Sequence, residues 1–521
     1  MASQSANSPL KTVTLGASGT TFEDVIDVAR HGAKVILDQS AIDAMNFSRK
    51  YIEDYAAGGV PVYGVSTGFG ALANRHIDVK DRVQLQKSLI RSHAAGIGPA
   101  VEVEVVRALM FLRLKTMATG RTGVRVKLAQ QYVDFLNAQI TPVVPEFGSL
   151  GCSGDLAPLS HCALAMMGEG RVIDAAGNEV DSLPAIKAAG IEPIQLEAKE
   201  GLALINGTDG MLGMLIMAIS DLRELARVAD ITTAMSIEGL LGTDRVFAPE
   251  LHFPLRPQIG QAKSAANIFA MLKDSGIVAS HRENDSRVQD AYSLRCAPQV
   301  AGAVRDTIDY AATIAERELA AAIDNPVVLP DGRVQSNGNF HGAPVAYVLD
   351  FLAIAATDLG SMAERRTDRA LDQHRSAGLA PFLADDPGVD SGLMIAQYTQ
   401  AGLVSENKRL STPASVDSIP SSAMQEDHVS MGWSAARKLR KVVDNLSRIL
   451  AIELVTASRA IEMRRGLAPA PATASVIQAL RATVAGPGPD RFLSPELEAA
   501  DRFVKSGAAS VAARKVVSEL A

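Results

Sequence analysis

The chain has 521 residues, 47% of them hydrophobic but only 4% aromatic, and its formal net charge is −7 at pH 7. This mildly acidic balance argues against a nucleic-acid partner, because phosphate binding needs clustered positive charge. Three cysteines without a Cys-x-x-Cys spacing argue against a disulfide framework and a structural zinc site.

The first ten residues, MASQSANSPL, lack the basic start and the apolar stretch of a secretory signal. The best candidate for a membrane span, residues 203–219, is interrupted by Asn206 and Asp209. It therefore falls short of the roughly 20 apolar residues that a bilayer requires. We expect a cytoplasmic protein without a membrane segment.

Glycine-rich turns punctuate the first 200 residues, which indicates a mixed domain of short elements. A hairpin is predicted where the polar turn 174–178 separates Val172 and Ile173 from Val180. Residues 156–170, directly after the glycine-rich turn 148–154, have a helical pattern.

From about residue 210 onward, helical periodicity dominates and predicts four long helices, at 211–241, 301–323, 343–366 and 433–463. The second should stop at Asp324-Asn325-Pro326, because proline lacks a backbone donor and restricts the residue before it. After Gly466, the prolines at 469, 471, 487 and 489 predict a loop followed by short helices. The expected fold is mainly α, with a mixed N-terminal domain at 1–210 and a long-helix bundle with a C-terminal helical region at 211–521.

The segment 148–159, GSLGCSGDLAPL, has an unusual concentration of glycine and small polar residues before Asp155. Taken alone, it is typical of a tight turn and a helix N-cap. Neither a Gly-x-Ser-x-Gly nucleophile elbow nor a phosphate-binding loop fits it.

This segment resembles the corresponding loop of the aromatic amino acid ammonia-lyases, most closely that of the histidine-specific members. Six further segments match the family in the same order: YGVSTGFG at 63–70, ALINGT at 203–208, QDAYSLRCAPQ at 289–299, DNP at 324–326, GNFH at 338–341 and QEDHVS at 425–430. The resemblance covers most of the chain. It implies the ammonia-lyase/fumarase-like fold and a homotetramer whose active sites each draw on three subunits.

The resemblance also implies an internal electrophile, 4-methylidene-imidazol-5-one (MIO), formed autocatalytically from Cys152-Ser153-Gly154. The Gly154 nitrogen would attack the Cys152 carbonyl, and the loss of two waters, one with the Ser153 hydroxyl, would leave an electron-poor alkene. Glycine suits this step because no side chain blocks the approach of its nitrogen. The family usually has alanine where Cys152 stands, so we expect the ring to form and to carry a thiol. No metal and no diffusible cofactor are expected.

The resemblance assigns Tyr63 as the base, which requires a depressed pKa because a neutral phenol is a poor base near pH 7. Arg295 would bind the substrate carboxylate through a bidentate pair. Tyr292, Asn206 and Gln289 would polarise the ring carbonyl or bind the carboxylate. The substrate ring would lie against Phe340. Each residue also has an ordinary interpretation as a packing, capping or salt-bridge residue.

Substrate choice is expected to rest on Ser92-His93 and Glu426. Phenylalanine-specific relatives carry an apolar pair at the first position, and tyrosine-specific ones usually begin it with histidine. An imidazole needs polar partners, which a phenyl ring would leave unpaired at a cost of about 1–3 kcal/mol each. Glu426 could accept from an imidazole N–H, stabilise an imidazolium or take the β-proton.

The expected reaction is the elimination of ammonia from L-histidine to give urocanate. A tyrosine or phenylalanine lyase, or an aminomutase with the same electrophile, is the alternative within the family. A catalytically silent helical assembly protein is the alternative outside it, supported only by Cys152. A fumarase-like lyase lacks support because its Gly-Ser-Ser-x-Met-Pro-x-Lys-x-Asn pattern is missing.

Overall fold

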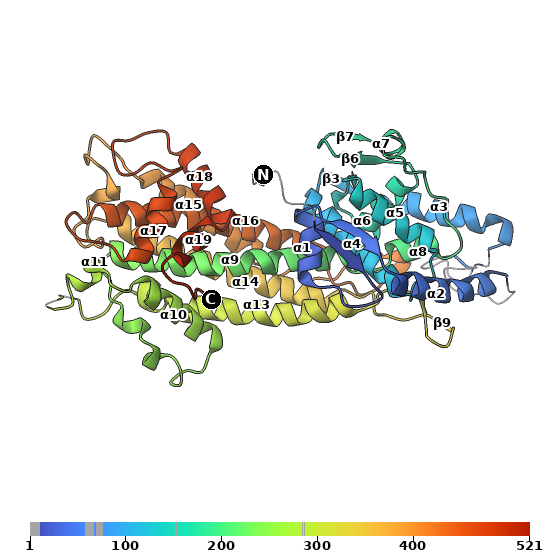
Figure 1. The fold of residues 1–521 in the computed structure, drawn as a ribbon, viewed down its shortest axis with the longest axis horizontal. Helices are drawn as coiled ribbons and strands as arrows, with labels where there is room; N and C mark the ends of the chain where they lie inside the picture. Colours follow the sequence, from blue (N-terminus) through green and yellow to red (C-terminus); the bar gives the residue numbers. More distant parts are fainter. Residues whose placement is uncertain are drawn as a thin grey trace.

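The structure is a computed structural model, and it describes residues 11–57, 67–68, 75, 77–151, 154–283, 285 and 287–521. The molecule is elongated, with four long helices along its axis and shorter elements gathered at the two ends (Figure 1). The last helices of the chain lie toward one end of this bundle.

Short strands and helices of the first 205 residues surround one end of the bundle (Figure 1). The strands form three small sheets: parallel β1 (Thr12–Leu15) and β2 (Lys34–Leu37), antiparallel β3 (Ile97–Ala100) and β5 (Pro145–Phe147), and antiparallel β4 (Thr141–Pro142), β6 (Arg171–Ile173) and β7 (Glu179–Asp181). The helices are α1 (Phe22–Arg30), α2 (Gln39–Ala57), η2 (Val79–Asp81), α3 (Arg82–His93), α4 (Val103–Ala118), α5 (Val126–Asn137), α6 (Leu156–Met166), α7 (Ser182–Ala188) and α8 (Glu200–Ile205).

Local sequence accounts for several of these boundaries. Thr21 and Asp24 form a reciprocal capping box at the start of α1, which satisfies two backbone donors of its first turn. The predicted hairpin is confirmed: Val172 pairs with Val180, and the Asp174 carboxylate accepts from the N–H of Asn178 across the turn. The helix predicted after residue 155 is confirmed as α6.

The long helices are α9 (Asp209–Gly239), α13 (Ala297–Ala320), α14 (Ala343–Leu371) and α16 (Gly432–Glu462). All four were predicted, with small differences at the ends. α13 begins four residues before the expected 301, because Pro298 fits the first turn of a helix. α14 continues five residues past 366 to Leu371, since no glycine or proline interrupts it.

Three of the long helices begin at the same end of the bundle. Gly342, just before α14, lies against Met211 at the start of α9 and against Ser430, just before α16. α13 runs in the opposite direction, since Thr208 before α9 donates to Glu318 near the end of α13. The bundle thus has one end where α9, α14 and α16 start and one where they finish.

The remaining elements lie between and after the long helices. They are η3 (Arg245–Phe247), η4 (Pro249–Leu251), α10 (Ile259–Met271), α11 (Gly276–Ala279), α12 (Tyr292–Arg295), the antiparallel pair β8 (Val327–Val328) and β9 (Val334–Gln335), η5 (Pro381–Leu383), α15 (Met394–Leu410), η6 (Ser422–Met424), α17 (Pro471–Leu480), α18 (Ser494–Lys505) and α19 (Ala508–Arg514).

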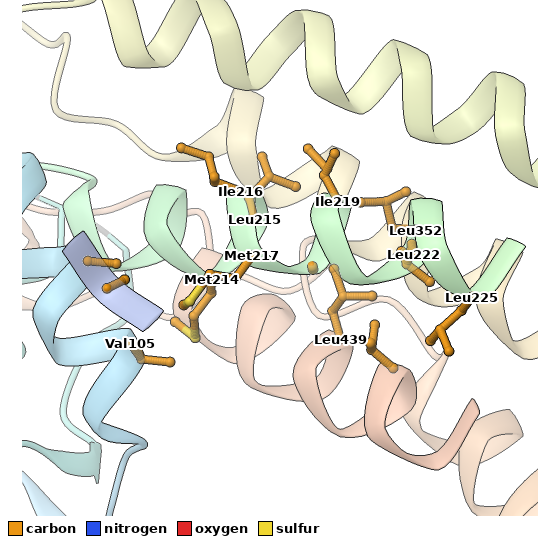
Figure 2. Packing of buried hydrophobic residues seen from close by; sticks show 14 of the residues in the cluster. Val105, Met214, Leu215, Ile216, Met217, Ile219, Leu222, Leu225, Leu352 and Leu439 are labelled. Carbon is orange, nitrogen blue, oxygen red and sulfur yellow. The ribbon is translucent and has the colours of Figure 1, made fainter. Parts of the chain in front are cut away.

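The core is centred on α9, which packs against α4, α13, α14 and α16. Figure 2 shows Met214 on the side of α9 that faces α4 and α16, which carry Val105 and Leu439, and Leu222 of α9 close to Leu352 of α14. This contact joins the N-terminal elements to the bundle in one continuous apolar cluster. The core does not separate residues 1–210 from residues 211–521, so the division into two domains near residue 210 remains a prediction from the sequence.

Two helical stretches have the length and mean hydropathy of a membrane span, Glu200–Gly239 and Ala343–Leu371. The apolar window of the first is 100% buried within the molecule, and that of the second is 61% buried. Their apolar character thus fits central helices of a packed bundle, which are hydrophobic on most sides.

Candidate active site

The glycine-rich loop 148–154 lies where α9 and α16 begin. The Gly151 carbonyl accepts from the Ser430 hydroxyl at 2.9 Å, and the Leu150 carbonyl accepts from the Met431 N–H at 2.9 Å. A Cβ at Gly151 would overlap the Ser430 hydroxyl oxygen. These contacts fix one side of the loop to the start of α16.

The other side of the loop is pressed against the Asn206-Gly207-Thr208 turn. Gly154 has φ +78°, in the left-handed region, and a Cβ there would overlap the Gly207 carbonyl. The next residue, Asp155, donates its N–H to that same carbonyl at 2.7 Å. Position 154 therefore requires glycine for both its conformation and its space.

Asp155 lies at the start of α6 but does not cap that helix with its side chain. Its carboxylate instead accepts from the N–H groups of Gly210 and Met211 at 2.8 and 2.9 Å and from the Ser149 hydroxyl at 3.0 Å. Complete burial raises the pKa of the Asp155 carboxyl to about 7, although the hydrogen bonds from Met211 and Ser149 oppose the rise. Asp155 thereby ties the loop to the first turn of α9.

An Asp155→Asn substitution tests this arrangement. Because the pKa in the folded protein is about 7 and that of an unfolded aspartate about 3.9, the folded state keeps a proton that the unfolded state releases. The stability from Asp155 is therefore present below about pH 4 and is lost as the pH rises through 7. Thermal unfolding should show the wild type losing a few kcal/mol relative to the variant between about pH 4 and pH 8. A difference that stays constant over this range would contradict the assignment.

The Asn206 turn is supported from behind by α4. Arg113, fully buried, donates to the Asn206 carbonyl at 2.9 Å and to the Ile323 carbonyl at 2.7 Å. The Asn206 side-chain amide donates to the Asn325 carbonyl at 2.8 Å. Its buried Oδ1 has no partner among the residues that the structure describes, so it can accept a hydrogen bond from a ligand.

The electrostatic character of this end of the bundle follows from the helix directions. α6, α9, α14 and α16 all begin around the loop and its supporting turn. A helix N-terminus carries unpaired N–H groups and a partial positive charge, so it stabilises anions. The loop thus lies in a region that favours a carboxylate or a developing negative charge.

His93 and Glu426, 333 positions apart, lie close enough to interact electrostatically. His93 ends α3, and its Nδ1 lies 2.9 Å from the Leu89 carbonyl, which requires Nδ1 to be the donor. Burial lowers the pKa of His93, while the Leu89 carbonyl and the Glu426 carboxylate act to raise it. A neutral His93 therefore has Nε2 as an acceptor. Glu426 accepts from the Ser421 hydroxyl at 3.1 Å.

Phe340 lies in the segment before α14 at the same end of the bundle and is half-buried. The adjacent His341 has its Nε2 3.3 Å from the His428 carbonyl, which connects this segment to the one that carries Glu426. The structure thus brings Gly154, Asn206, Phe340, His93 and Glu426 to one end of the molecule.

Three other predicted residues lie at the opposite end. Gln289 and Tyr292 are exposed, and Arg295 is half-buried with its guanidinium 4.6 Å from the centre of the Tyr292 ring. Their segment is attached beyond the end of α9, where Arg287 donates to the Leu240 carbonyl. Since α9 has 31 residues, about 45 Å of helix separates this segment from Gly154 in one chain.

Tyr63, Cys152 and Ser153, also predicted as catalytic, lie outside the described residues. Within the described part of the chain, no group of three or more His, Cys, Asp or Glu side chains could hold a metal ion.

Sequence reasoning missed several residues that shape the site. Ser430 ends the matched segment QEDHVS, two residues before α16 begins, but its contact with Gly151 carries no local signal. Arg113 could have been found as a charged residue inside an apolar helix, where it must have buried partners. No local pattern indicates that its partner is the Asn206 carbonyl, 93 residues away along the chain.

The sequence model described as aromatic amino acid lyase matches residues 20–482. The histidine ammonia-lyase of Streptomyces griseus is 65% identical over 515 residues, which are 98% of this chain and 100% of that protein. That of Caldanaerobacter subterraneus subsp. tengcongensis is 44% identical over 499 residues, 96% of this chain and 97% of that protein.

Solved structures of related enzymes superimpose on nearly the whole chain. Tyrosine aminomutase from Streptomyces globisporus superimposes with a TM-score of 0.91 at 38% identity, over 97% of this chain and 99% of that one. Histidine ammonia-lyase from Trypanosoma cruzi superimposes with a TM-score of 0.89 at 38% identity, over 97% and 95% of the two chains. Enzymes with different names thus share this fold almost equally well, and the fold alone does not separate their reactions.

Proposed function

The chain belongs to the aromatic amino acid lyase family, and we propose that it is a histidine ammonia-lyase that converts L-histidine to urocanate and ammonia. The observation that carries this proposal is the polar pair His93 and Glu426 at the same end of the bundle as the Gly154 loop. The 65% identity to the Streptomyces griseus histidine ammonia-lyase supports the same substrate. Free thiols at Cys162 and Cys296 fit a reducing, cytoplasmic location.

The family implies an MIO group, which we assign to Cys152, Ser153 and Gly154. The described residues fit it, because Gly154 is held in a left-handed conformation with no room for a side chain against Gly207. Once formed, the group supplies an electron-poor alkene for the substrate to attack. Asp155 and Gly151 keep the two sides of this loop in place through α9 and α16.

Histidine recognition is assigned to His93 and Glu426. With Nδ1 bound to the Leu89 carbonyl, His93 offers Nε2 to a substrate imidazole N–H. A carboxylate such as Glu426 favours an imidazole or imidazolium over a phenol or phenyl ring. Asn206 Oδ1, buried and without a partner among the described atoms, suits a donor such as the substrate amine.

Arg295, Tyr292 and Gln289 can complete this site only if another copy of the chain supplies them, because about 45 Å of α9 separates them from Gly154. A large exposed apolar surface supports such an assembly. Tyr310 of α13 is 53% exposed, and Tyr347 and Phe351 of α14 are 50% and 45% exposed. We propose a homotetramer that buries these side chains and forms shared active sites.

An aminomutase or a tyrosine lyase is the second candidate, since the Streptomyces globisporus aminomutase shares the fold. Its 38% identity is well below the 65% of the Streptomyces griseus histidine ammonia-lyase. The polar environment of His93 also disfavours an aromatic ring without hydrogen-bonding atoms.

The test is a parallel assay of purified protein with histidine, tyrosine and phenylalanine, recording the conjugated acid and ammonia. We expect urocanate from histidine and no product from the other two. Glu426→Gln should lower kcat/KM for histidine by about 5- to 160-fold, since a polar partner of the imidazole contributes roughly 1–3 kcal/mol. Turnover of tyrosine with histidine inert would overturn the assignment, and formation of a β-amino acid would favour the aminomutase.

A further inference from the structure

A buried ion pair crosses the bundle near the far end of α14 and α16. The Arg366 guanidinium and the Glu453 carboxylate are 1% and 0% exposed, and two N–H···O contacts of 2.5 and 3.0 Å join them. Two planar groups paired in this way fix each other's orientation as well as their distance.

Two hydroxyls of α9 complete the coordination of Glu453. Thr232 donates to one carboxylate oxygen at 2.7 Å, and Ser236 donates to the other at 2.9 Å. Glu453 thus receives four hydrogen bonds from two helices. Arg366, in turn, cannot rotate without breaking its contacts with this fixed acceptor.

Arg366 also forms a hydrogen bond with α12, through a guanidinium N–H that does not contact Glu453. Nη1 donates to the Ser293 carbonyl at 3.2 Å. Ser293 belongs to the four-residue helix α12, which carries Tyr292 on one side and Arg295 at its end. One hydrogen bond therefore connects the buried Arg366–Glu453 pair to the backbone between Tyr292 and Arg295, both of which are proposed to bind the substrate.

Asp290, just before α12, forms two further contacts, one of them with the chain that follows α9. The Asp290 carboxylate accepts from the Thr243 N–H at 2.8 Å, and the Asp290 carbonyl accepts from Arg295 Nε at 3.0 Å. These contacts hold the start of α12. The Arg366 contact connects the middle of α12 to the core of α14 and α16, which have few ways to move.

We propose that Arg366, oriented by Glu453, is a positioning residue that sets the direction of Arg295 and Tyr292 toward the active site of a neighbouring copy. This inference rests on the proposed function. A buried ion pair is a poor source of stability, because desolvation offsets its attraction. The planar fork of arginine nevertheless allows one side chain to engage a carboxylate and a carbonyl together, which a lysine ammonium cannot match.

The decisive variant is Arg366→Lys, which keeps a positive charge beside Glu453 and loses the donor to Ser293. In the full-length enzyme we expect the KM for histidine to rise about tenfold or more, since small displacements of a positioned group have effects of this size. Histamine, which has the imidazole and the amine of histidine but no carboxylate, should inhibit the variant and the wild type with the same Ki within about twofold. A purely structural role would affect both ligands alike.

The matched control is Arg305→Lys, at the buried pair between Arg305 and Asp230, which are 2.6 Å apart. This pair also joins α9 to a neighbouring long helix, and neither residue hydrogen-bonds to α12 in the structure as described. Its KM for histidine should stay within about twofold of the wild-type value.

Three results would overturn the proposal: an unchanged KM in Arg366→Lys, a parallel rise in the Ki of histamine, or the same KM change in Arg305→Lys. If Arg366→Lys does not fold, Ser236→Ala serves instead, because it loosens Glu453 and leaves the ion pair intact. It should raise KM in the same direction by a smaller factor, and an unchanged KM would overturn the proposal. Failure of the proposed function itself is distinguishable, because the wild type would then not turn over histidine.

Discussion

A Gly154→Ala variant is expected to lose at least about a thousandfold in activity on histidine, because it should not form the electrophile on which elimination depends. A Cβ at this position would overlap the Gly207 carbonyl, and its φ of +78° disfavours any side chain. Alanine would thus push residue 154 away from the turn that presses on it. Intact mass spectrometry should find wild-type protein lighter than its encoded mass by two waters and the variant at its full encoded mass.

Gly177→Ala is the matched control. Gly177 has a similar φ of +85°, but a Cβ there would meet nothing within 4 Å. The variant therefore carries the same kind of backbone strain without the overlap, and it should keep both the loss of two waters and the activity. Wild-type mass and activity in Gly154→Ala would refute the role of this loop.

Mixing two inactive variants should restore activity. Gly154→Ala and Arg295→Met each disable one part of the site, and in one chain these parts lie about 45 Å apart along α9. If each site combines Gly154 of one copy with Arg295 of another, about a quarter of the sites in randomly mixed oligomers contain both native residues. Coexpression of the two variants should therefore yield about a quarter of the wild-type activity.

The control for this experiment pairs Gly154→Ala with Asn206→Ala. These residues lie at the same end of one chain, since the Gly207 carbonyl accepts from Asp155. No mixed site could then have both native residues, and activity should stay absent. Restoration in this control, or none with Arg295→Met, would contradict the shared site.

Much of the fold could be predicted because its signals are local. The long helix predicted at 433–463 is confirmed as α16, with each end within one residue of the prediction. It was predictable because its apolar side chains recur every three or four positions. The hairpin at 172–180 was found because Asp174 and Gly177 favour a turn. The glycine-rich loop and its matching segments indicated the family before any contact was known.

The sequence by itself thus determined the family, the long helices and the chemistry expected at Gly154. Only the tertiary structure decided which partners these residues have. Asp155 caps α9 and not its own helix, and Arg366 holds the Ser293 carbonyl 73 residues away. Periodicity and motif spacing report interactions between neighbours in the chain, whereas the partners of a buried charge depend on how distant helices pack. For the same reason the sequence could align Arg295 with the family but could not place it about 45 Å from Gly154 within one chain.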